Sequence, residues 1–164
     1  MNGKVLSKSG ATMTERDLFA FCGLYCGACG LRGLKEPAEE IKRILDAYNY
    51  GEIAKFILGM EEYPAFEKIL AEFTKVFCLG CRQGWGNPGC VIRICAKERG
   101  LETCADCKEV PCEKARFIIE GYPEVLENLK RIKHVGVDKW LKEQREKVAT
   151  GFSYTDVLNK RKKR

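Results

Sequence analysis

Ten cysteines among 164 residues constrain this chain more than any other feature of its sequence. Cysteines at this density form disulfides, bind metal ions or carry redox chemistry, and the cellular compartment decides among these roles. Residues 1–20 contain no apolar core of a signal peptide, and Glu15, Arg16 and Asp17 stand where that core would lie. We therefore expect a protein of the reducing cytoplasm, in which metal ligation is favoured over disulfides and over redox thiols.

The composition indicates an ordinary globular protein. Hydrophobic residues make up 45% and charged residues 32%, which excludes wholesale disorder and burial in a membrane. The length predicts one domain, or one domain with short appendages. The closing run 160–164 supplies five of the six net positive charges, so the remainder is nearly balanced and a basic stripe for nucleic acid is not expected.

The chain divides into a polar leader over 1–13, a single metal-binding domain over 14–159 and a basic tail over 160–164. We expect the leader to be disordered and the tail to be solvated. Order should begin at Thr14, a plausible N-cap for a short helix through Phe19.

Apolar residues recur at helical spacing between 37 and 77, which predicts two long helices with a shorter one between them. Their stripes should pack in the core and comprise Ile41, Ile44, Leu45, Tyr48, Phe66, Ile69, Leu70, Phe73 and Phe77. Further helices are expected over 91–99, 112–120, 123–134 and 138–148. The predicted fold is mainly α, a small helical domain with cysteine-rich loops and little or no sheet.

Three cysteine pairs have the two-residue spacing of zinc knuckles: Cys26 with Cys29, Cys78 with Cys81, and Cys104 with Cys107. This spacing lets both thiolates turn toward one ion. All ten cysteines are candidate metal ligands, namely Cys22, Cys26, Cys29, Cys78, Cys81, Cys90, Cys95, Cys104, Cys107 and Cys112.

Two groupings of these ligands into four-thiolate sites are possible. Because short loops cost least to close, the first grouping joins the consecutive Cys78, Cys81, Cys90 and Cys95. The second site would then use Cys26, Cys29, Cys104 and Cys107, with Cys22 and Cys112 as substitutes. The alternative grouping pairs Cys26 and Cys29 with Cys78 and Cys81 and leaves the C-terminal cysteines to themselves.

Zinc is the favoured metal because the sites look closed and structural, and an iron-sulfur cluster is the alternative. The spacing of Cys22, Cys26 and Cys29 matches the cluster motif of radical S-adenosylmethionine enzymes. The short chain without a βα pattern argues against that class, as does Ala28 where an aromatic residue is usual.

We favour a non-catalytic role. The chain has no Ser-His-Asp set, no His-Glu-x-x-His helix and no Walker-type loop. Its single histidine, His134, falls near the end of a predicted helix, where the helix dipole favours an imidazolium. Trp85 and Trp140 are expected to be apolar anchors, although Trp85 in its glycine-rich loop could face a partner.

The ordered cysteine motifs resemble a prokaryotic family known as domain of unknown function thirty-seven ninety-five. The matching segments are CGLYCGAC at 22–29, CLGC at 78–81, CVIRICAKERG at 90–100, CADCKEVPCEK at 104–114 and the helical segment at 127–147. The resemblance implies zinc binding by the cysteines and no particular activity. The helical stretch 37–77 departs from the shorter connection common in the family, and the C-terminus lacks the extra cysteine pair that some members add.

Three functions follow from this sequence. The first is a cytoplasmic zinc protein whose metal sites shape a surface for a protein partner. The second is an iron-sulfur protein of electron transfer, and the third is a zinc protein that binds nucleic acid through the basic tail and the zinc knuckles. No membrane association is expected.

Overall fold

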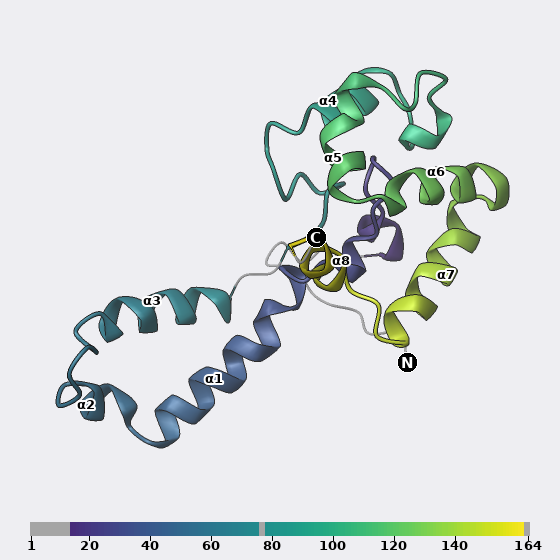
Figure 1. Ribbon diagram of the computed structural model, residues 1–164. Helices are drawn as coiled ribbons and strands as arrows, with labels where there is room; N and C mark the ends of the chain where they lie inside the picture. The colour runs from purple at the N-terminus through teal and green to yellow at the C-terminus, as the bar shows by residue number, and fades with distance from the viewer. Residues whose placement is uncertain (1–13, 76–77, 163–164) are drawn as a thin grey trace. The chain divides into compact units, whose positions relative to one another are not determined.

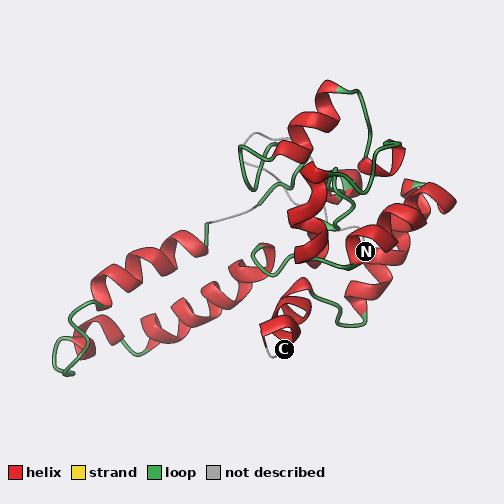
Figure 2. Cartoon of the chain, turned by 45° about the horizontal axis from the view of Figure 1, so that its top comes forward, coloured by secondary structure: helices red, strands yellow, loops and turns green. Residues whose placement is uncertain are grey.

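The computed structural model describes residues 14–75 and 78–162, so the predicted leader over 1–13 lies outside the described residues (Figure 1). The chain divides into two compact units. We call residues 14–29 with 79–162 the core unit and residues 30–78 the hairpin unit. The prediction of a mainly helical fold is confirmed, because the described residues contain helices and loops, with one isolated bridge between Phe19 and Tyr25 (Figure 2).

The hairpin unit consists of a 3-10 turn and three helices. These are η3 (Arg32–Leu34), α1 (Lys35–Ala47), α2 (Tyr50–Ala54) and α3 (Tyr63–Phe73). Asn49 ends the first helical stretch in the left-handed region with φ 48°. Pro64 lies in the first turn of α3, where its missing N–H costs no hydrogen bond. Helices α1 and α3 lie side by side in both views (Figures 1 and 2).

Little of the hairpin unit is buried. Ala38, Ala54, Tyr63 and Leu70 are its buried apolar residues among those described. The prediction that its stripes pack in a core is wrong for most positions, since the exposed side chains include Ile41, Ile44, Tyr48, Phe66, Ile69 and Phe73. Periodicity identifies residues that share a helix face but does not say what covers that face. Phe77 lies outside the described residues.

The core unit contains the remaining elements. These are η1 (Glu15–Leu18), η2 (Cys26–Ala28), α4 (Val91–Glu98), η4 (Cys104–Asp106), η5 (Glu113–Ala115), α5 (Arg116–Gly121), α6 (Glu124–Val135), α7 (Val137–Ala149) and α8 (Tyr154–Lys162). Thr14 is the N-cap of η1, as predicted, and the Asp17 carboxylate accepts a hydrogen bond from its backbone N–H at 2.7 Å. None of the described helices is long and apolar enough to cross a bilayer.

One helix prediction needs adjustment. The predicted helix over 112–120 is split into η5 and α5, and the segments over 123–134 and 138–148 correspond to α6 and α7. Helix α8 was not predicted because its apolar positions are few. It contains the first three residues of the predicted tail.

The core forms around Trp140, which is fully buried. The rings of Phe19 and Trp140 lie 5.3 Å apart, and Tyr25 meets Trp140 edge-on at 6.2 Å. Val125 and Leu129 of α6 join this cluster. Since Phe19 and Tyr25 flank the first cysteines, the core of this unit is assembled directly on the N-terminal cysteine loop.

Candidate metal centre

The loop over 19–29 carries Cys22, Cys26 and Cys29 and is held from three sides. Asn128 of α6 donates its side-chain N–H to the Gly23 carbonyl at 3.0 Å, and the backbone N–H of Tyr25 donates to the Tyr154 hydroxyl at 3.1 Å. The loop closes on itself through Ala20 N–H and the Leu24 carbonyl at 3.0 Å. Distant elements thus fix the backbone that presents these thiols.

Cys22 is the most deeply placed thiol of this loop. Burial raises its pKa to about 12, although the backbone N–H of Leu24 donates to it and lowers the pKa. Cys81, Cys26 and, least of the three, Cys104 lie close enough to raise the pKa of Cys22 further. Cys81 is therefore a neighbour of the first cysteine loop. We call Cys22, Cys26, Cys29 and Cys81 the N-terminal cysteine set.

Gly80 explains how the segment before Cys81 comes so near. Its φ is +93°, and a Cβ built there would lie 2.5 Å from the Asp17 carbonyl oxygen and 3.9 Å from the Cys26 sulfur. Only glycine tolerates both this backbone conformation and this approach. Arg82 then donates to the Phe19 carbonyl at 2.7 Å and to the Glu102 carbonyl at 2.6 Å.

Cys29 and Cys78 lie at the points in the sequence where one unit ends and the other begins. Burial raises the pKa of Tyr122, and Cys29 and Cys22 raise it further, so Cys29 lies near the rest of its set. Cys78 is the last residue of the hairpin unit, and Arg32 of that unit donates to its carbonyl.

The other five cysteines gather around Cys104. We call Cys90, Cys95, Cys104, Cys107 and Cys112 the C-terminal cysteine set. Burial raises the pKa of Cys104 to about 12, and the nearby thiols raise it further in the order Cys112, Cys107, Cys95 and Cys90. Cys104 is the buried member of the set, and its backbone N–H donates to the Phe21 carbonyl at 2.8 Å.

Short helices present each of these thiols. Cys90 is the N-cap of α4, on which Cys95 lies, and Cys112 is the N-cap of η5. Cys104 opens η4 and Cys107 follows its end, where the Cys107 N–H donates to the Cys104 carbonyl at 3.1 Å. The Asp106 carboxylate accepts from the Thr103 backbone N–H at 3.1 Å and so closes the start of η4.

A cavity of about 240 Å³ lies within this set. Its lining includes four of the five thiols together with apolar side chains: Cys95, Cys104, Cys107, Cys112, Ile92, Ala96, Leu101, Val110 and Ala115. The charged residues Arg99, Glu109, Glu113 and Lys114 also line it. The cavity thus has a lining of thiols and apolar side chains with charged residues of both signs beside them.

Arginines accompany both cysteine sets. Arg99 donates to the Cys107 sulfur at 3.5 Å and to both Glu109 oxygens at 3.0 and 2.9 Å. The hydrogen bond to Glu109 is the main cause of the raised pKa of Arg99, and Cys107 and Cys95 contribute to it. Burial lowers the pKa of Arg82, while Glu102 and Cys81 oppose that change.

Arg93 organises the glycine-rich loop between Cys81 and Cys90. Its guanidinium is buried and donates to carbonyl oxygens of the loop, at 2.8 Å to Trp85, 2.7 Å to Asn87 and 3.0 Å to Pro88. Sequence reasoning missed this residue. The available signal was its position between Cys90 and Cys95, on the helix predicted over 91–99.

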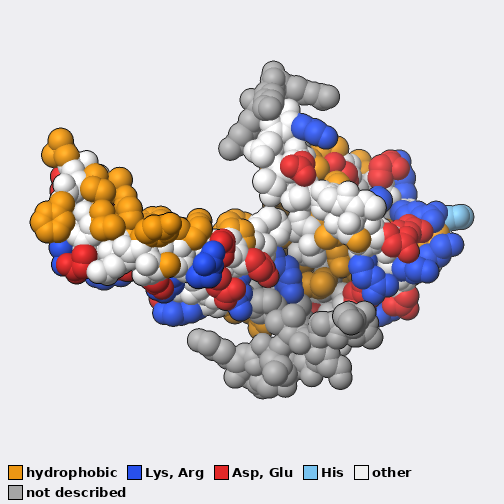
Figure 3. Space-filling model, turned by 90° about the horizontal axis from the view of Figure 1, so that it is seen from below, with side chains coloured by type: hydrophobic (Ala, Val, Ile, Leu, Met, Phe, Trp, Pro, Cys, Tyr) orange, Lys and Arg blue, Asp and Glu red, His pale blue; other side chains and the backbone are white. Residues whose placement is uncertain are grey.

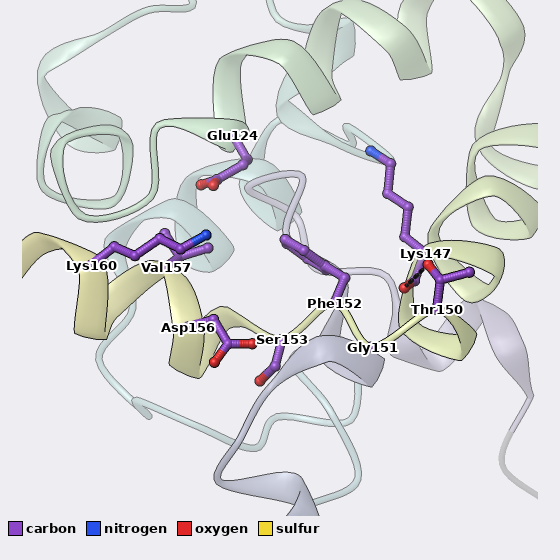
Figure 4. Close-up of a pocket in the computed structure, with 9 residues that line it drawn as sticks. All are labelled: Glu124, Lys147, Thr150, Gly151, Phe152, Ser153, Asp156, Val157 and Lys160. Atoms are coloured by element: carbon purple, nitrogen blue, oxygen red, sulfur yellow. Dashed lines mark hydrogen bonds between the residues drawn. The ribbon is translucent and has the colours of Figure 1, made fainter.

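A second cavity, of about 550 Å³, contains no cysteine (Figure 4). It is formed where α6 begins and where α7 is connected to α8, and it is lined by Glu124, Lys147, Thr150, Gly151, Phe152, Ser153, Asp156, Val157 and Lys160. The Oε2 atom of Glu124 is buried and has no hydrogen-bond partner among the described residues. No sequence motif pointed to this cavity.

The donor chemistry of the two sets suits a thiolate-bound metal, although no group of three or more His, Cys, Asp and Glu side chains in the described residues is already arranged to hold an ion. All ten cysteines lie in the described part of the chain, and none forms a disulfide there. The structure brings Cys90 and Cys95 to Cys104 and brings Cys81 to Cys22 and Cys26. The proximity of Cys81 to Cys22 and Cys26 agrees with the alternative grouping, whereas the place of Cys78 and the sharing of a metal ion stay predictions.

A family model described as Protein of unknown function (DUF3795) matches residues 18–117. The chain belongs to this family. The DUF3795 match contains all ten cysteines and ends within α5, so both cysteine sets are part of the family domain. No curated protein and no solved structure matches the chain.

Proposed function

We propose that this DUF3795 protein is a metal-binding scaffold in which two sets of cysteine thiolates each hold a zinc ion. The observation that carries the proposal is the placement of Cys104, which is buried among four other thiols. A buried thiol with a pKa of about 12 remains protonated at neutral pH, and a bound metal replaces that proton by coordinating the thiolate.

Arginines beside the cysteines favour a metal site that carries net negative charge. Four thiolates around one divalent ion carry a net charge of about −2 when each ligand is deprotonated. Arg99 contacts two thiols of the C-terminal set, and Arg82 lies close enough to Cys81 to interact with it. These cations would lower the cost of holding negative charge beside the core.

The role we assign to the metal is structural, and the surface it shapes serves a protein partner. The N-terminal cysteine loop touches Trp140 through its flanking aromatic residues, and the C-terminal set is tied to it by the bond from Cys104 to Phe21. Structural zinc contributes about 10 to 16 kcal/mol of apparent binding free energy, which is comparable to the whole stability of a domain.

An iron-sulfur cluster is the second candidate, and it is favoured by the cavity in the C-terminal set. A volume of about 240 Å³ lined by thiols and apolar side chains exceeds what one tetrahedral zinc ion needs. Four cysteine thiolates also hold [4Fe–4S] clusters, whose potentials depend on burial and on hydrogen bonds to sulfur, such as the one from Arg99.

Metal analysis of the anaerobically purified full chain tests the proposal. We expect about two zinc ions per chain and no visible charge-transfer absorption. Iron and acid-labile sulfide in equal amounts, with absorption in the visible range, would establish the second candidate. Protein that retains neither metal after anaerobic purification would refute both.

Replacing single cysteines with serine identifies the ligands. Serine is a poor zinc donor, so Cys104→Ser and Cys81→Ser should each remove one zinc ion and should do so independently. The C-terminal set holds five thiols and a tetrahedral site takes four, so one of its five positions should tolerate the change. That tolerated variant is the matched control, because it removes the same sulfur from the same set.

A further inference from the structure

The hairpin unit presents two matching apolar stripes to solvent. The exposed residues are Ile41 and Ile44 of α1 with its C-cap residue Tyr48, and Phe66, Ile69 and Phe73 of α3. Both triplets have the spacing i, i+3, i+7, which places their side chains on one side of each helix. Their exposed fractions run from 40% for Phe73 to 71% for Tyr48.

The segment that joins the helices continues the apolar surface. Phe56 is 88% exposed and Leu58 is 97% exposed, and the exposed residues Ile53, Ile57 and Met60 lie beside them in sequence. Hydrophobic side chains gather along one face of the hairpin unit in the space-filling view (Figure 3). Apolar surface of this extent on a soluble chain marks an interaction site.

Several charged side chains of the hairpin unit form ion pairs with one another. Lys42 pairs with Asp46 at 2.7 Å, Lys55 with Glu52 at 2.7 Å and Lys75 with Glu72 at 3.0 Å. Each of these pairs closes within its own segment, and the i+4 position of each triplet is also apolar, Leu45 in the first and Leu70 in the second. The stripe residues themselves therefore offer no charge by which an acidic or basic partner could be selected.

The exposed area matches what a stable dimer buries. With about 200 Å² for a fully exposed side chain of this size, the six stripe residues expose roughly 600 Å². The five residues of the connecting segment bring the total to roughly 1,200 Å² per copy, estimated in the same way. Standard protein interfaces bury about 800 Å² on each partner.

We propose that a second copy of this chain covers this face, and that the two hairpin units form a four-helix bundle with twofold symmetry. A two-helix hairpin buries almost nothing by itself, whereas four helices enclose a core. Twofold symmetry requires one surface to complement itself. Two stripes of equal spacing meet this requirement, because α1 of one protomer can face α3 of its partner and the reverse contact is identical.

The full chain with its metal bound is the sample for the test, and its mass is measured by light scattering after size exclusion and by sedimentation equilibrium. We expect a dimer. In a twofold dimer, Ile44→Glu or Phe73→Glu buries one unpaired carboxylate on each protomer. Each variant should therefore weaken dimerisation roughly a hundred-fold or more and give a monomer. Circular dichroism must show that both variants keep their helices.

A control variant comes from the core unit. Phe117 of α5 is 53% exposed, which is similar to Ile44 and Phe73. Phe117→Glu therefore adds the same charge outside the proposed interface and should leave the dimer intact. A mixing experiment adds a second measurement. Ile44→Glu chains mixed with Ile69→Lys chains should form a heterodimer, because opposite charges then face each other across one of the two equivalent contacts.

Three results would overturn the proposal. The first is a monomeric wild-type chain at every concentration that remains soluble. The second is a dimer that survives both stripe variants, since its interface would lie elsewhere. The third is a monomer that binds vesicles of phosphatidylcholine and phosphatidylglycerol through Phe56 and Leu58, since the face would then serve a membrane surface.

Discussion

The core unit and the hairpin unit are built from helices of similar length and similar apolar periodicity, yet they differ in what covers the apolar faces. In the core unit, α6 and α7 pack on Phe19 and Tyr25, which flank the N-terminal cysteine loop. In the hairpin unit, the equivalent stripes on α1 and α3 remain exposed. Nine of the ten cysteines belong to the core unit: three in the N-terminal loop, five in the C-terminal set, and Cys81. The tenth, Cys78, is the last residue of the hairpin unit.

This difference suggests that the two units obtain stability from different sources. The core unit would depend on metal, because its loops carry the cysteines and its helices pack against those loops. The hairpin unit would depend on association, because isolated short helices are marginal in water. The predictions that follow test this division, beginning with the largest expected effect.

Metal removal should affect the core unit far more than the hairpin unit. Chelation under reducing, oxygen-free conditions should unfold the core unit, since structural zinc contributes about 10 to 16 kcal/mol. Trp85 and Trp140 both lie in the core unit, so tryptophan emission reports on that unit alone. We expect a red shift of the emission while part of the helical circular dichroism signal persists and grows with protein concentration.

Unchanged emission after complete metal removal would contradict this expectation and would show that the core unit folds without metal. A second sample, reloaded with zinc, is the control for irreversible damage. Its emission should return to that of the untreated protein.

The sequence predicted most of the helices and the cysteine-rich loops, because both depend on local patterns, but it did not predict α8. Thr14, the cysteine spacing and the periodicity of 123–148 are local signals of this kind. The apolar anchoring role of Trp140 was predicted from its residue type, although the Phe19 and Tyr25 rings that cover it are distant in sequence. Burial was not predictable for Ile41, Ile44, Phe66 and Ile69, because their exposure depends on which surface faces them and not on their spacing.

The grouping of the cysteines shows the same limit. Loop length favoured joining Cys81 to Cys90 and Cys95, but Gly80 passes within contact of Asp17 and places Cys81 beside Cys22 instead. A positive φ and a close backbone approach leave no periodic signal in a sequence. Gly80, between Cys78 and Cys81, was the only feature of the sequence that pointed to this close approach.

Gly80→Ala should produce the next largest effect. The new Cβ would combine an unfavourable φ with a contact of 2.5 Å to a backbone oxygen, which cannot move aside as a flexible side chain can. We expect a loss of about 2 to 5 kcal/mol of unfolding free energy, from backbone strain and overpacking together. Denaturant unfolding of the metal-loaded protein measures it.

Gly84→Ala is the matched control for that change. Gly84 has nearly the same φ, +82°, but a Cβ there would meet no atom within 4 Å. Its cost should therefore be the backbone strain alone, about 1 to 2 kcal/mol. Equal losses for both variants would mean that the approach of Gly80 to Asp17 does not matter for stability.

Arg93→Met should cost less, about 1 to 3 kcal/mol, because carbonyl oxygens of the loop lose their donor while much of the buried side-chain volume is retained. The glycine-rich loop should also become more accessible to proteolysis. Arg116→Met is the control, since Arg116 is largely exposed and pairs with Glu113 in an exposed i, i+3 contact worth about 0 to 1 kcal/mol. Thermal unfolding compares the two variants. If the Arg93 variant is as stable as the Arg116 variant, Arg93 does not stabilise the loop.

Removal of the tail should have the smallest effect. Helix α8 is anchored at its first residue, because the ring of Tyr154 is buried against Tyr122 and Phe152 and its hydroxyl accepts the Tyr25 N–H of the cysteine loop. Beyond Tyr154, Val157 of this helix packs against the core, whereas Lys160 is exposed and lines the second cavity. A chain that ends at Asn159 should therefore keep its metal and lose less than about 0.5 kcal/mol, as surface changes usually do. Tyr154→Phe keeps the buried ring and removes the hydroxyl that hydrogen-bonds the Tyr25 N–H and the Asn128 side chain, so it should cost about 1 kcal/mol or more and exceed the effect of deleting five residues. Thermal melts of the metal-loaded forms rank the two changes, and the reverse order would mean that the tail docks on the core unit.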